Sequence, residues 1–418
     1  MEIKVQEESV GVLPSSPPQV EMRGRDLAGV ASLPVRDINV KRVHQLDGLR
    51  GVAMLFVFMG HFATIWTSIV PHKGAADFFL RLVDADATLG SSFFMLLSGF
   101  FGYGSLMRGT RGFREFMRGR LCRLYPLYLI MVAVYVAGSI LIPKMSKLPP
   151  DPQRTAVFML ETLFLLPGLL PIRPLMEVSW TLSFVVMFYF IEAALAGLFK
   201  AWGLRRETRF SIFLLAAVAW AVWGYFSGWW EPRTTAFWIG MALSEAIEGM
   251  SGQQQTWAVR LVTPAAGVAI GGLLLRTVLM LEKPDTGVVP LMLLRTAITS
   301  ATLFWFVWVA YFGPEWWKRL LSSSQLRHLG SASYSFYLTH GLAVKAFRFG
   351  IVPWLGPAAA STEVVFWMSQ VSGLWLAIVI ARIVCRFVEN PLSKWVARPI
   401  GNAVWQMQPA RVIPTTTV

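Results

Sequence analysis

An apolar stretch, LDGLRGVAMLFVFMGH at residues 46–61, contains ionisable side chains whose spacing could do chemistry. Arg50 and His61 are eleven residues apart, and Asp47 precedes Arg50 by three. Because an α-helix has 3.6 residues per turn, Arg50 and His61 share one helix face, about 16 Å apart along the axis. Histidine is the usual general base near neutral pH. The pattern predicts that His61 deprotonates a hydroxyl group, while Arg50 and Asp47 organise the other end of the same face.

Each of these residues also has a structural interpretation. Arg50 could extend from a helix end to the membrane surface, and His61 could form a hydrogen bond between two helices. An ionisable side chain within a membrane segment is nonetheless a functional hypothesis by default. We therefore treat both residues as candidates and ask which elements could position them.

The composition indicates a membrane protein. The chain has 418 residues, of which 55% are hydrophobic and 15% charged, and its mean hydropathy is +0.53. A typical soluble domain has about 25% charged residues. Such a chain cannot cover its surface with polar groups, so we expect an all-α, polytopic protein embedded in the lipid bilayer. The net charge of +14 falls in short clusters between apolar runs, which favours membrane topology over a nucleic-acid partner.

About ten transmembrane helices are expected, since each apolar run approaches the ~20 residues needed to cross the hydrocarbon layer. The runs are 51–70, 88–107, 124–142, 180–199, 210–229, 235–250, 258–279, 289–312, 331–350 and 365–387. Residues 155–170 end in the proline-rich LPGLLPIRP and are expected to form a re-entrant or interfacial helix. Counting them as a span would place the basic RRETR cluster outside. We therefore expect both termini in the cytosol.

Three regions follow from this pattern. Residues 1–43 are polar and contain prolines, which predicts a disordered cytosolic tail. Residues 44–395 form the expected membrane domain, and 396–418 a short C-terminal tail. The two cysteines, Cys122 and Cys385, give no disulfide framework or metal-site spacing, so no metal is expected. The type of membrane is open, and an endomembrane is expected if the source is a eukaryote.

An arginine cluster follows the second predicted span. It comprises Arg108, Arg111, Arg114, Arg118, Arg120 and Arg123. Guanidinium groups bind phosphates, so the cluster could hold a phosphate-bearing ligand. Any inner loop is also basic, which is the alternative interpretation. Arg120 and Arg123, one helical turn apart at the membrane entry, are the stronger candidates.

Several further motifs occur in a fixed order along the chain. They are GSSFFMLLSGFFGY (90–103), RGRLCRLYPLYLI (118–130), SWTLSFVVMFYFI (179–191), LGSASYSFYLTH (329–340) and FVENP (387–391). With the Leu-Asp-Gly-x-Arg-Gly and Arg-x10-His pattern of residues 46–61, this order resembles the acyltransferase type 3 family of integral-membrane O-acyltransferases. The resemblance covers about residues 44–395.

The resemblance implies an acyl-CoA-dependent enzyme with no bound cofactor. It implies donor binding by Arg120 and Arg123, and it supports His61, Arg50 and Asp47 as catalytic residues. Residues that could contribute to a polar cavity are Ser98, Trp180, Ser183, Tyr334 and His340. His340 is the second candidate for the general base.

The sequence departs from the family pattern at Val185. The family commonly has a glutamate five positions after the tryptophan that corresponds to Trp180. Glu177 or Glu192 could supply the missing carboxylate, and Glu192 lies seven residues beyond Val185 on a similar helix face.

Other charged residues have no assigned role. Arg276 is expected to extend to the outer surface, and Arg295 lies about seven residues inside its run. The acidic residues Asp77, Asp84 and Asp86 are expected to face water.

The predicted function is transfer of an acyl group, acetyl or longer, from acyl-CoA to a hydroxyl of a small molecule such as a secondary metabolite. One alternative is an acyltransferase acting on a cell-surface glycan. Another is a transporter with a polar central cavity, although broken helices and paired halves are not evident. A scaffold with a degenerate site is a third, and Val185 is its best support. The oligomeric state is open.

Overall fold

A computed structural model describes residues 44–397 except 71–72, 110–111, 228–230, 249, 251, 282–288 and 357–360. These residues belong to one compact unit. The predicted N-terminal tail and residues 398–418 of the predicted C-terminal tail lie outside the described residues, as does Arg111.

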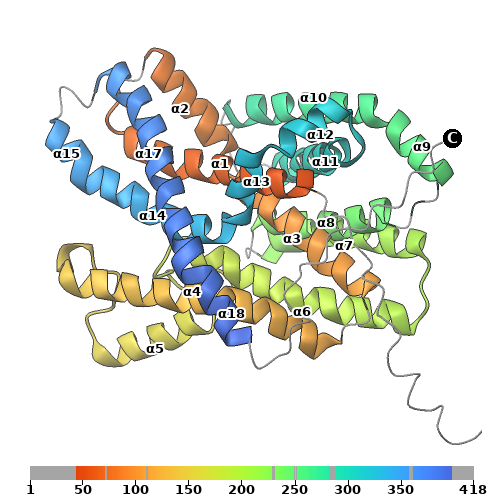
Figure 1. Cartoon of the computed structure of the whole chain (residues 1–418), viewed down its shortest axis with the longest axis horizontal. Helices are drawn as coiled ribbons and strands as arrows, with labels where there is room; N and C mark the ends of the chain where they lie inside the picture. The colour runs from red at the N-terminus through yellow and green to blue at the C-terminus, as the bar shows by residue number, and fades with distance from the viewer. Residues whose placement is uncertain are drawn as a thin grey trace, which may run out of the picture. The chain divides into compact units, whose positions relative to one another are not determined.

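The described residues form an all-α fold without strands, as the sequence predicts (Figure 1). The helices are α1 His44–Trp66, α2 Ala75–Asp86, α3 Leu89–Arg108, α4 Phe113–Leu141, α5 Pro152–Leu163, α6 Ser179–Ala201, α7 Arg206–Ser227, α8 Thr235–Ile247, α9 Gly252–Arg260, α10 Val262–Leu281, α11 Val289–Phe312, α12 Glu315–Leu321, α13 Ser324–Ser331, α14 Ser333–Ala346, α15 Val352–Leu355, α17 Glu363–Val384 and α18 Asn390–Ala397. Short 3₁₀ turns are η3 Pro143–Met145 and η4 Pro232–Thr234, and π-helical turns are η5 Phe347–Ile351 and η6 Cys385–Glu389.

Eight helical stretches of the described residues are long and apolar enough to cross a membrane. They are His44–Trp66, Ala75–Arg108, Phe113–Leu141, Ser179–Ala201, Arg206–Phe226, Val262–Leu281, Leu291–Phe312 and Glu363–Val396. The two other predicted spans coincide with α8 and α14, which have 13 and 14 residues. Both are shorter than the ~20 residues of a span, although η5 and α15 extend α14 to Leu355. Helix α5 has 12 residues, too few to cross the bilayer, as its proline-rich end predicts.

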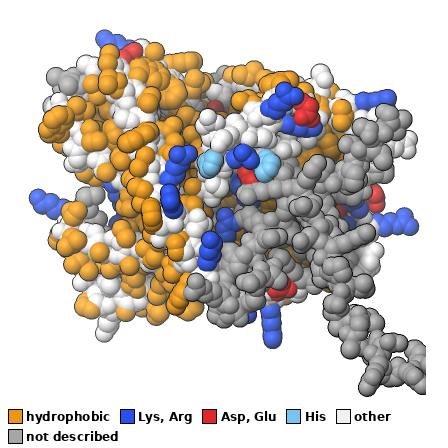
Figure 2. All heavy atoms as spheres, viewed as in Figure 1, with side chains coloured by type: hydrophobic (Ala, Val, Ile, Leu, Met, Phe, Trp, Pro, Cys, Tyr) orange, Lys and Arg blue, Asp and Glu red, His pale blue; other side chains and the backbone are white. Residues whose placement is uncertain are grey.

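The surface of the bundle is suited to lipid. Large apolar side chains are exposed along the candidate spans, for example Leu215, Ile270, Val371 and Trp375. On the face shown in Figure 2, hydrophobic side chains cover one side, and Lys and Arg side chains gather in groups beside them. In water such a surface would be unfavourable, so the chain is an integral, multi-pass membrane protein.

Close helix contacts fix the position of α1, which carries the opening motif. Helix α1 packs against α3, α12, α13 and α14. A Cβ atom added at Gly48 would lie 1.7 Å from the carbonyl oxygen of Leu321, and one added at Gly330 would lie 1.9 Å from that of Asp47. Only glycine permits these contacts, and small residues allow helix backbones to approach closely within membranes. The glycines of the motif therefore place Arg50 and His61 by fixing α1 against α12 and α13.

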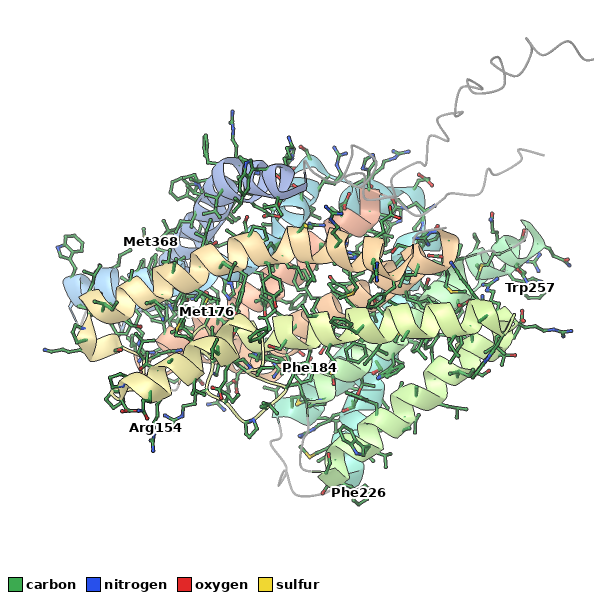
Figure 3. All side chains as sticks on the ribbon, turned by 90° about the horizontal axis from the view of Figure 1, so that it is seen from below. Arg154, Met176, Phe184, Phe226, Trp257 and Met368 are labelled. Carbon is green, nitrogen blue, oxygen red and sulfur yellow. The ribbon has the colours of Figure 1, made fainter. Side chains whose placement is uncertain are left out.

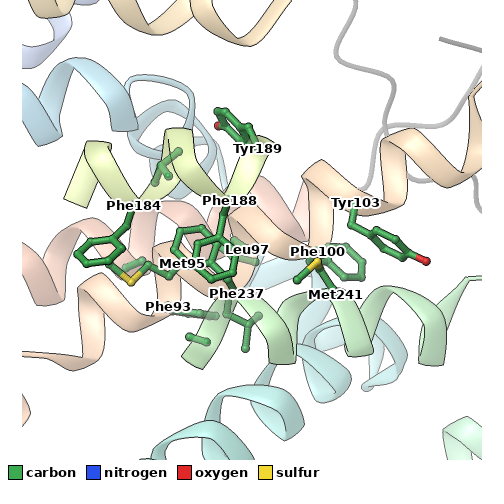
Figure 4. Packing of buried hydrophobic residues seen from close by; sticks show 14 of the residues in the cluster. Phe93, Met95, Leu97, Phe100, Tyr103, Phe184, Phe188, Tyr189, Phe237 and Met241 are labelled. Atoms are coloured by element: carbon green, nitrogen blue, oxygen red, sulfur yellow. The ribbon is translucent and has the colours of Figure 1, made fainter. Parts of the chain in front are cut away.

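Aromatic packing holds the centre of the bundle. Helix α3 lies against α6 and α8. The rings of Phe188 on α6 and Phe237 on α8 stack with their centroids 4.0 Å apart, and the buried Phe100 and Tyr103 line the facing side of α3 (Figure 4). The two ends of the bundle are distinct, since Arg154 on α5 and Trp257 on α9 lie at opposite ends (Figure 3).

Candidate active site

Two histidines from distant parts of the chain meet near the C-terminal end of α1. The ring centroids of His61 on α1 and His340 on α14 are 5.0 Å apart, with their planes tilted by 49°. His340 is 1% exposed, and its Nδ1 lies 3.2 Å from the carbonyl oxygen of Phe336, one turn earlier. Because a carbonyl only accepts, Nδ1 carries the proton and Nε2 is an acceptor. Nε2 is buried and has no hydrogen-bond partner among the described residues.

Groups from α6 and α14 complete this part of the site. The Tyr337 ring is 6.0 Å from that of His340, and its hydroxyl donates to the carbonyl of Val178 at 3.2 Å. The guanidinium of Arg233 lies 4.1 Å above the ring of Trp180, and its charge acts on His61. We call His61, His340, Tyr337, Trp180 and Arg233 the histidine region.

A carboxylate stands next to the histidine region. Glu177 pairs with Lys147 at 3.3 Å, and its charge acts on His61. Burial raises the pKa of the Glu177 carboxyl, but Lys147, His61 and Lys345 together outweigh it and lower the pKa below its ordinary value. Glu177 is therefore ionised at neutral pH. It is one of the two carboxylates that the sequence offers in place of the family's glutamate at Val185.

Arginines meet near the N-terminal end of α1. Arg50 pairs with Asp47 at 3.7 Å and lies 4.4 Å above the ring of Phe101 on α3. The charges of Arg120 and Arg123, both on α4, act on Arg50. The structure thus brings together Asp47, Arg50, Arg120 and Arg123, which we call the arginine region. Three guanidinium groups beside the Asp47 carboxylate favour binding of an anion such as a phosphate group.

Aromatic faces and a buried carboxylate hold Arg120. Its guanidinium lies 5.1 Å from the ring centroid of Tyr189 and 5.2 Å from that of Phe116. Its charge also acts on Glu192, which is completely buried and whose two carboxylate oxygens have no hydrogen-bond partner in the described chain. Glu192 occupies space left by Gly102, since a Cβ there would lie 1.9 Å from Oε2. The second replacement carboxylate therefore belongs to the arginine region.

The remaining predicted cavity residues mostly support the helices. The Tyr334 hydroxyl donates to the carbonyl of Leu124, and the charge of Arg123 acts on Tyr334. Ser183 is buried and donates to the carbonyl of Ser179 within α6 at 3.2 Å. Ser98 is half-buried on α3. These contacts place Tyr334 beside the arginine region and give Ser183 a partner within its own helix.

Helix α14 is anchored by a residue of the closing motif. The Ser335 hydroxyl donates to the carboxylate of Glu389 on η6, and both side chains are buried. This contact fixes α14, which carries His340 to His61. The motifs FVENP and LGSASYSFYLTH contain Glu389 and Ser335, but no pattern in the sequence indicated that these side chains meet. Arg233 lies in none of the quoted motifs.

Two expectations about charged residues are wrong. Arg276 does not extend to the surface, because its side chain is completely buried and pairs with Asp86. Asp86 is therefore not merely solvated, and it also accepts a hydrogen bond from Thr277 at 2.9 Å. A guanidinium enclosed by apolar helices requires a partner of opposite charge, and α2 brings Asp86 to α10.

Neither cysteine nor metal chemistry is evident in the described residues. Cys122 and Cys385 are free thiols. Within those same residues, His, Cys, Asp and Glu side chains nowhere form a group of three that could hold a metal ion.

The fold is that of an integral-membrane protein, and comparison with known families identifies the class as acyltransferase. A sequence model of the acyltransferase type 3 family, described as an acyltransferase domain, matches residues 43–386. The chain therefore belongs to this family, as its motifs indicated.

Two named relatives are similar over most of their own length. Protein 2 in the picA locus of Rhizobium radiobacter is 29% identical over 191 residues, which are 42% of this chain and 89% of the relative. The exopolysaccharide production protein ExoZ of Rhizobium meliloti (strain 1021) is 27% identical over 285 residues, which are 65% of this chain and 81% of the relative. No solved structure is significantly similar to this one.

Proposed function

We propose that the protein transfers an acyl group from acyl-CoA to a hydroxyl group of a carbohydrate. The observation that supports this most directly is the division of α1 between two regions of different chemistry. Its N-terminal part contributes Asp47 and Arg50 to the arginine region, and its C-terminal part contributes His61 to the histidine pair. An enzyme that joins an anionic donor to a neutral hydroxyl needs one site of each kind.

The donor would enter at the arginine region. Arg50, Arg120 and Arg123 would hold the phosphates of CoA, with Glu192 and the aromatic rings keeping Arg120 in place. The pantetheine arm would then follow α1 toward His61. Both termini would lie on this side, in the cytosol, where acyl-CoA is found.

The chemical step would take place at the histidines. His61 removes the proton from the acceptor hydroxyl, whose oxygen attacks the thioester carbonyl. The C–O ester bond forms as the C–S bond breaks, and CoA leaves as a thiolate that receives a proton. The carboxylate of Glu177 would stabilise the imidazolium formed at His61, because opposite charges attract. His340 would orient the His61 ring by packing against it.

A carbohydrate acceptor is favoured by the relative named for exopolysaccharide production. This reverses the order given by the sequence, in which a small molecule came first. Membership of an acyltransferase family also argues against the transporter.

The test is to incubate the purified protein in nanodiscs with acyl-labelled acetyl-CoA or longer acyl-CoAs and two pools from the host, polysaccharide and organic-soluble metabolites. Label should enter the polysaccharide and be released by mild alkali as the free acid, as expected for an ester. Label that enters only the organic-soluble pool would assign a small-molecule acceptor. Absence of transfer from every acyl-CoA would overturn the proposed reaction.

A further inference from the structure

A cavity with a mostly apolar wall and several polar side chains lies beside the histidine region, with which it shares Arg233. Its volume is about 140 Å³, and its walls come from α3, η4, α8, α10 and α11. Pockets that enclose drug-sized ligands are larger, about 300–1,000 Å³, so this cavity is suited to a single small ring. The polar side chains that line it include Thr88, Ser92, Arg233, Arg295, Thr296 and Thr299.

The hydroxyl groups of this cavity are prepared to accept hydrogen bonds. Ser92, Thr296 and Thr299 each donate to a backbone carbonyl one turn earlier, at 2.8–3.0 Å. Because each proton is already committed, the oxygens of Ser92 and Thr296 offer lone pairs to a ligand. The Thr299 oxygen already accepts from Arg276 Nε at 3.1 Å, which leaves it one lone pair. A ligand that carries several hydroxyl groups would match them.

Arg295 brings a buried positive charge to the same cavity. Its side chain is 9% exposed, its Nη2 donates to the carbonyl of Leu279 at 2.5 Å, and its Nε has no hydrogen-bond partner in the described chain. The positive charge of the neighbouring Arg276 repels that of Arg295. Buried charges are costly unless they are paired.

The other cations near the cavity already have carboxylate partners. Arg276 pairs with Asp86, and Arg233 binds Glu231 through two nitrogens, one of them at 2.6 Å. Among the described residues, Arg295 has no ion pair with a carboxylate. One positive charge is therefore left for a ligand, which suits a single carboxylate better than a doubly charged phosphate.

Arg233 connects the cavity to the histidines. It lines the cavity, its guanidinium lies over Trp180, and its charge acts on His61. A sugar held in the cavity would thus contact Arg233, whose charge acts on the proposed general base.

We propose that this cavity binds an acidic sugar residue of the acceptor, with the sugar carboxylate on Arg295 and its hydroxyl groups on Ser92, Thr296 and Thr299. This rests on the proposed function and narrows the acceptor to an anionic glycan. An uncharged glycan would leave Arg295 without a carboxylate partner among the residues that the structure describes.

The experiment measures binding without acyl-CoA. The probes are a tetrasaccharide that contains one glucuronate residue and the same tetrasaccharide after its carboxyl group has been reduced to a neutral alcohol. The protein in nanodiscs should bind the acidic probe at least tenfold more tightly. Arg295→Gln should remove this preference and Arg295→Lys should retain part of it. Arg260→Gln, at an exposed arginine on α9, is the matched control and should leave the preference intact.

Three outcomes would overturn the inference. If the wild-type protein binds the two probes with equal affinity, the sugar carboxylate has no role in binding; this comparison needs no variant. If a correctly folded Arg295→Gln protein loses affinity for both probes equally, Arg295 has a structural role. Displacement of the acidic probe by a polyprenyl phosphate, dependent on Arg295, would assign the anion to a lipid headgroup instead.

Acyl transfer is measured in parallel on the same preparations. Charge-selective binding without transfer would contradict the proposed function and leave this site intact. Transfer to both probes with equal KM would contradict the acidic-sugar site and leave the function intact.

Discussion

At the N-terminal end of α1, Arg50 lies among two further arginines, a carboxylate and an aromatic ring. At the C-terminal end, His61 lies against a second imidazole that is almost completely buried. The first region is charged and stabilises its cations with ring faces. The second contains one guanidinium, Arg233, which is paired with Glu231, and has the carboxylate of Glu177 beside it. Binding of an anionic donor and removal of a proton require these opposite environments, and a single helix provides both.

The sharpest test of this contrast is removal of the imidazole in the histidine region. His61→Ala should lower kcat by about 10²–10⁴-fold, since general-base catalysis contributes this much. Acyl-CoA affinity, measured by binding of a non-hydrolysable analogue, should change little. His328→Ala, at an exposed histidine, is the control and should retain activity.

His61→Asn separates catalysis from packing, because the amide can keep a hydrogen bond but cannot act as the base. If His61→Asn keeps more than about a tenth of the wild-type turnover, the loss of rate is far smaller than removal of a general base would cause. His61 would then be structural. His340, with its unpartnered Nε2, would then be the next residue to test.

Substitutions in the arginine region should change the KM for acyl-CoA and leave kcat nearly unchanged. Changing both Arg120 and Arg123 to Gln should raise the KM for acyl-CoA about tenfold or more, because each ionic hydrogen bond contributes about 1.5–3 kcal/mol. Wild-type donor affinity should also fall with added salt. Arg154→Gln, on α5 at the other end of the bundle from α9, serves as control. An unchanged donor KM in the folded double variant would rule out this role.

The smallest effect is expected at Glu177, whose side chain is 67% exposed. Exposed charge pairs contribute about 0.2–1 kcal/mol, so Glu177→Gln should lower kcat/KM only about 1.4- to fivefold at neutral pH. The pKa of Glu177 is lowered in the folded protein, so its carboxylate is charged at any pH above that pKa. The charge is lost as the pH falls through this pKa. The rates of the two proteins should therefore converge in acid.

A pH profile of kcat/KM checks this convergence, with Glu207→Gln at an exposed position as control. A constant ratio of the two rates across the acid range would mean that the charge of Glu177 does not act on the reaction.

The sequence alone determined features that depend on local spacing. Eleven residues of helix place Arg50 and His61 on one face, and a three-residue step does the same for Arg120 and Arg123, because the helical period is fixed by the backbone. Apolar run lengths predicted ten spans, and eight of them correspond to helices of the described residues that are long and apolar enough to cross a membrane. The proline-rich end of residues 155–170 predicted that α5 would not span. The apolar run at 235–250 overestimated the length of α8, because composition does not show where a helix ends.

Only the tertiary structure decided which distant residues meet. The ring of His340 packs against that of His61, and the charge of Arg120 acts on Glu192. Asp86 pairs with Arg276, although 190 residues separate them. Such contacts depend on how closely helices cross, which is set by glycine contacts such as Gly48 against Leu321 and by the fit of side chains between helices. Periodicity within one helix carries no information on these crossings, so the wrong expectation for Arg276 could be corrected only by its neighbours in space.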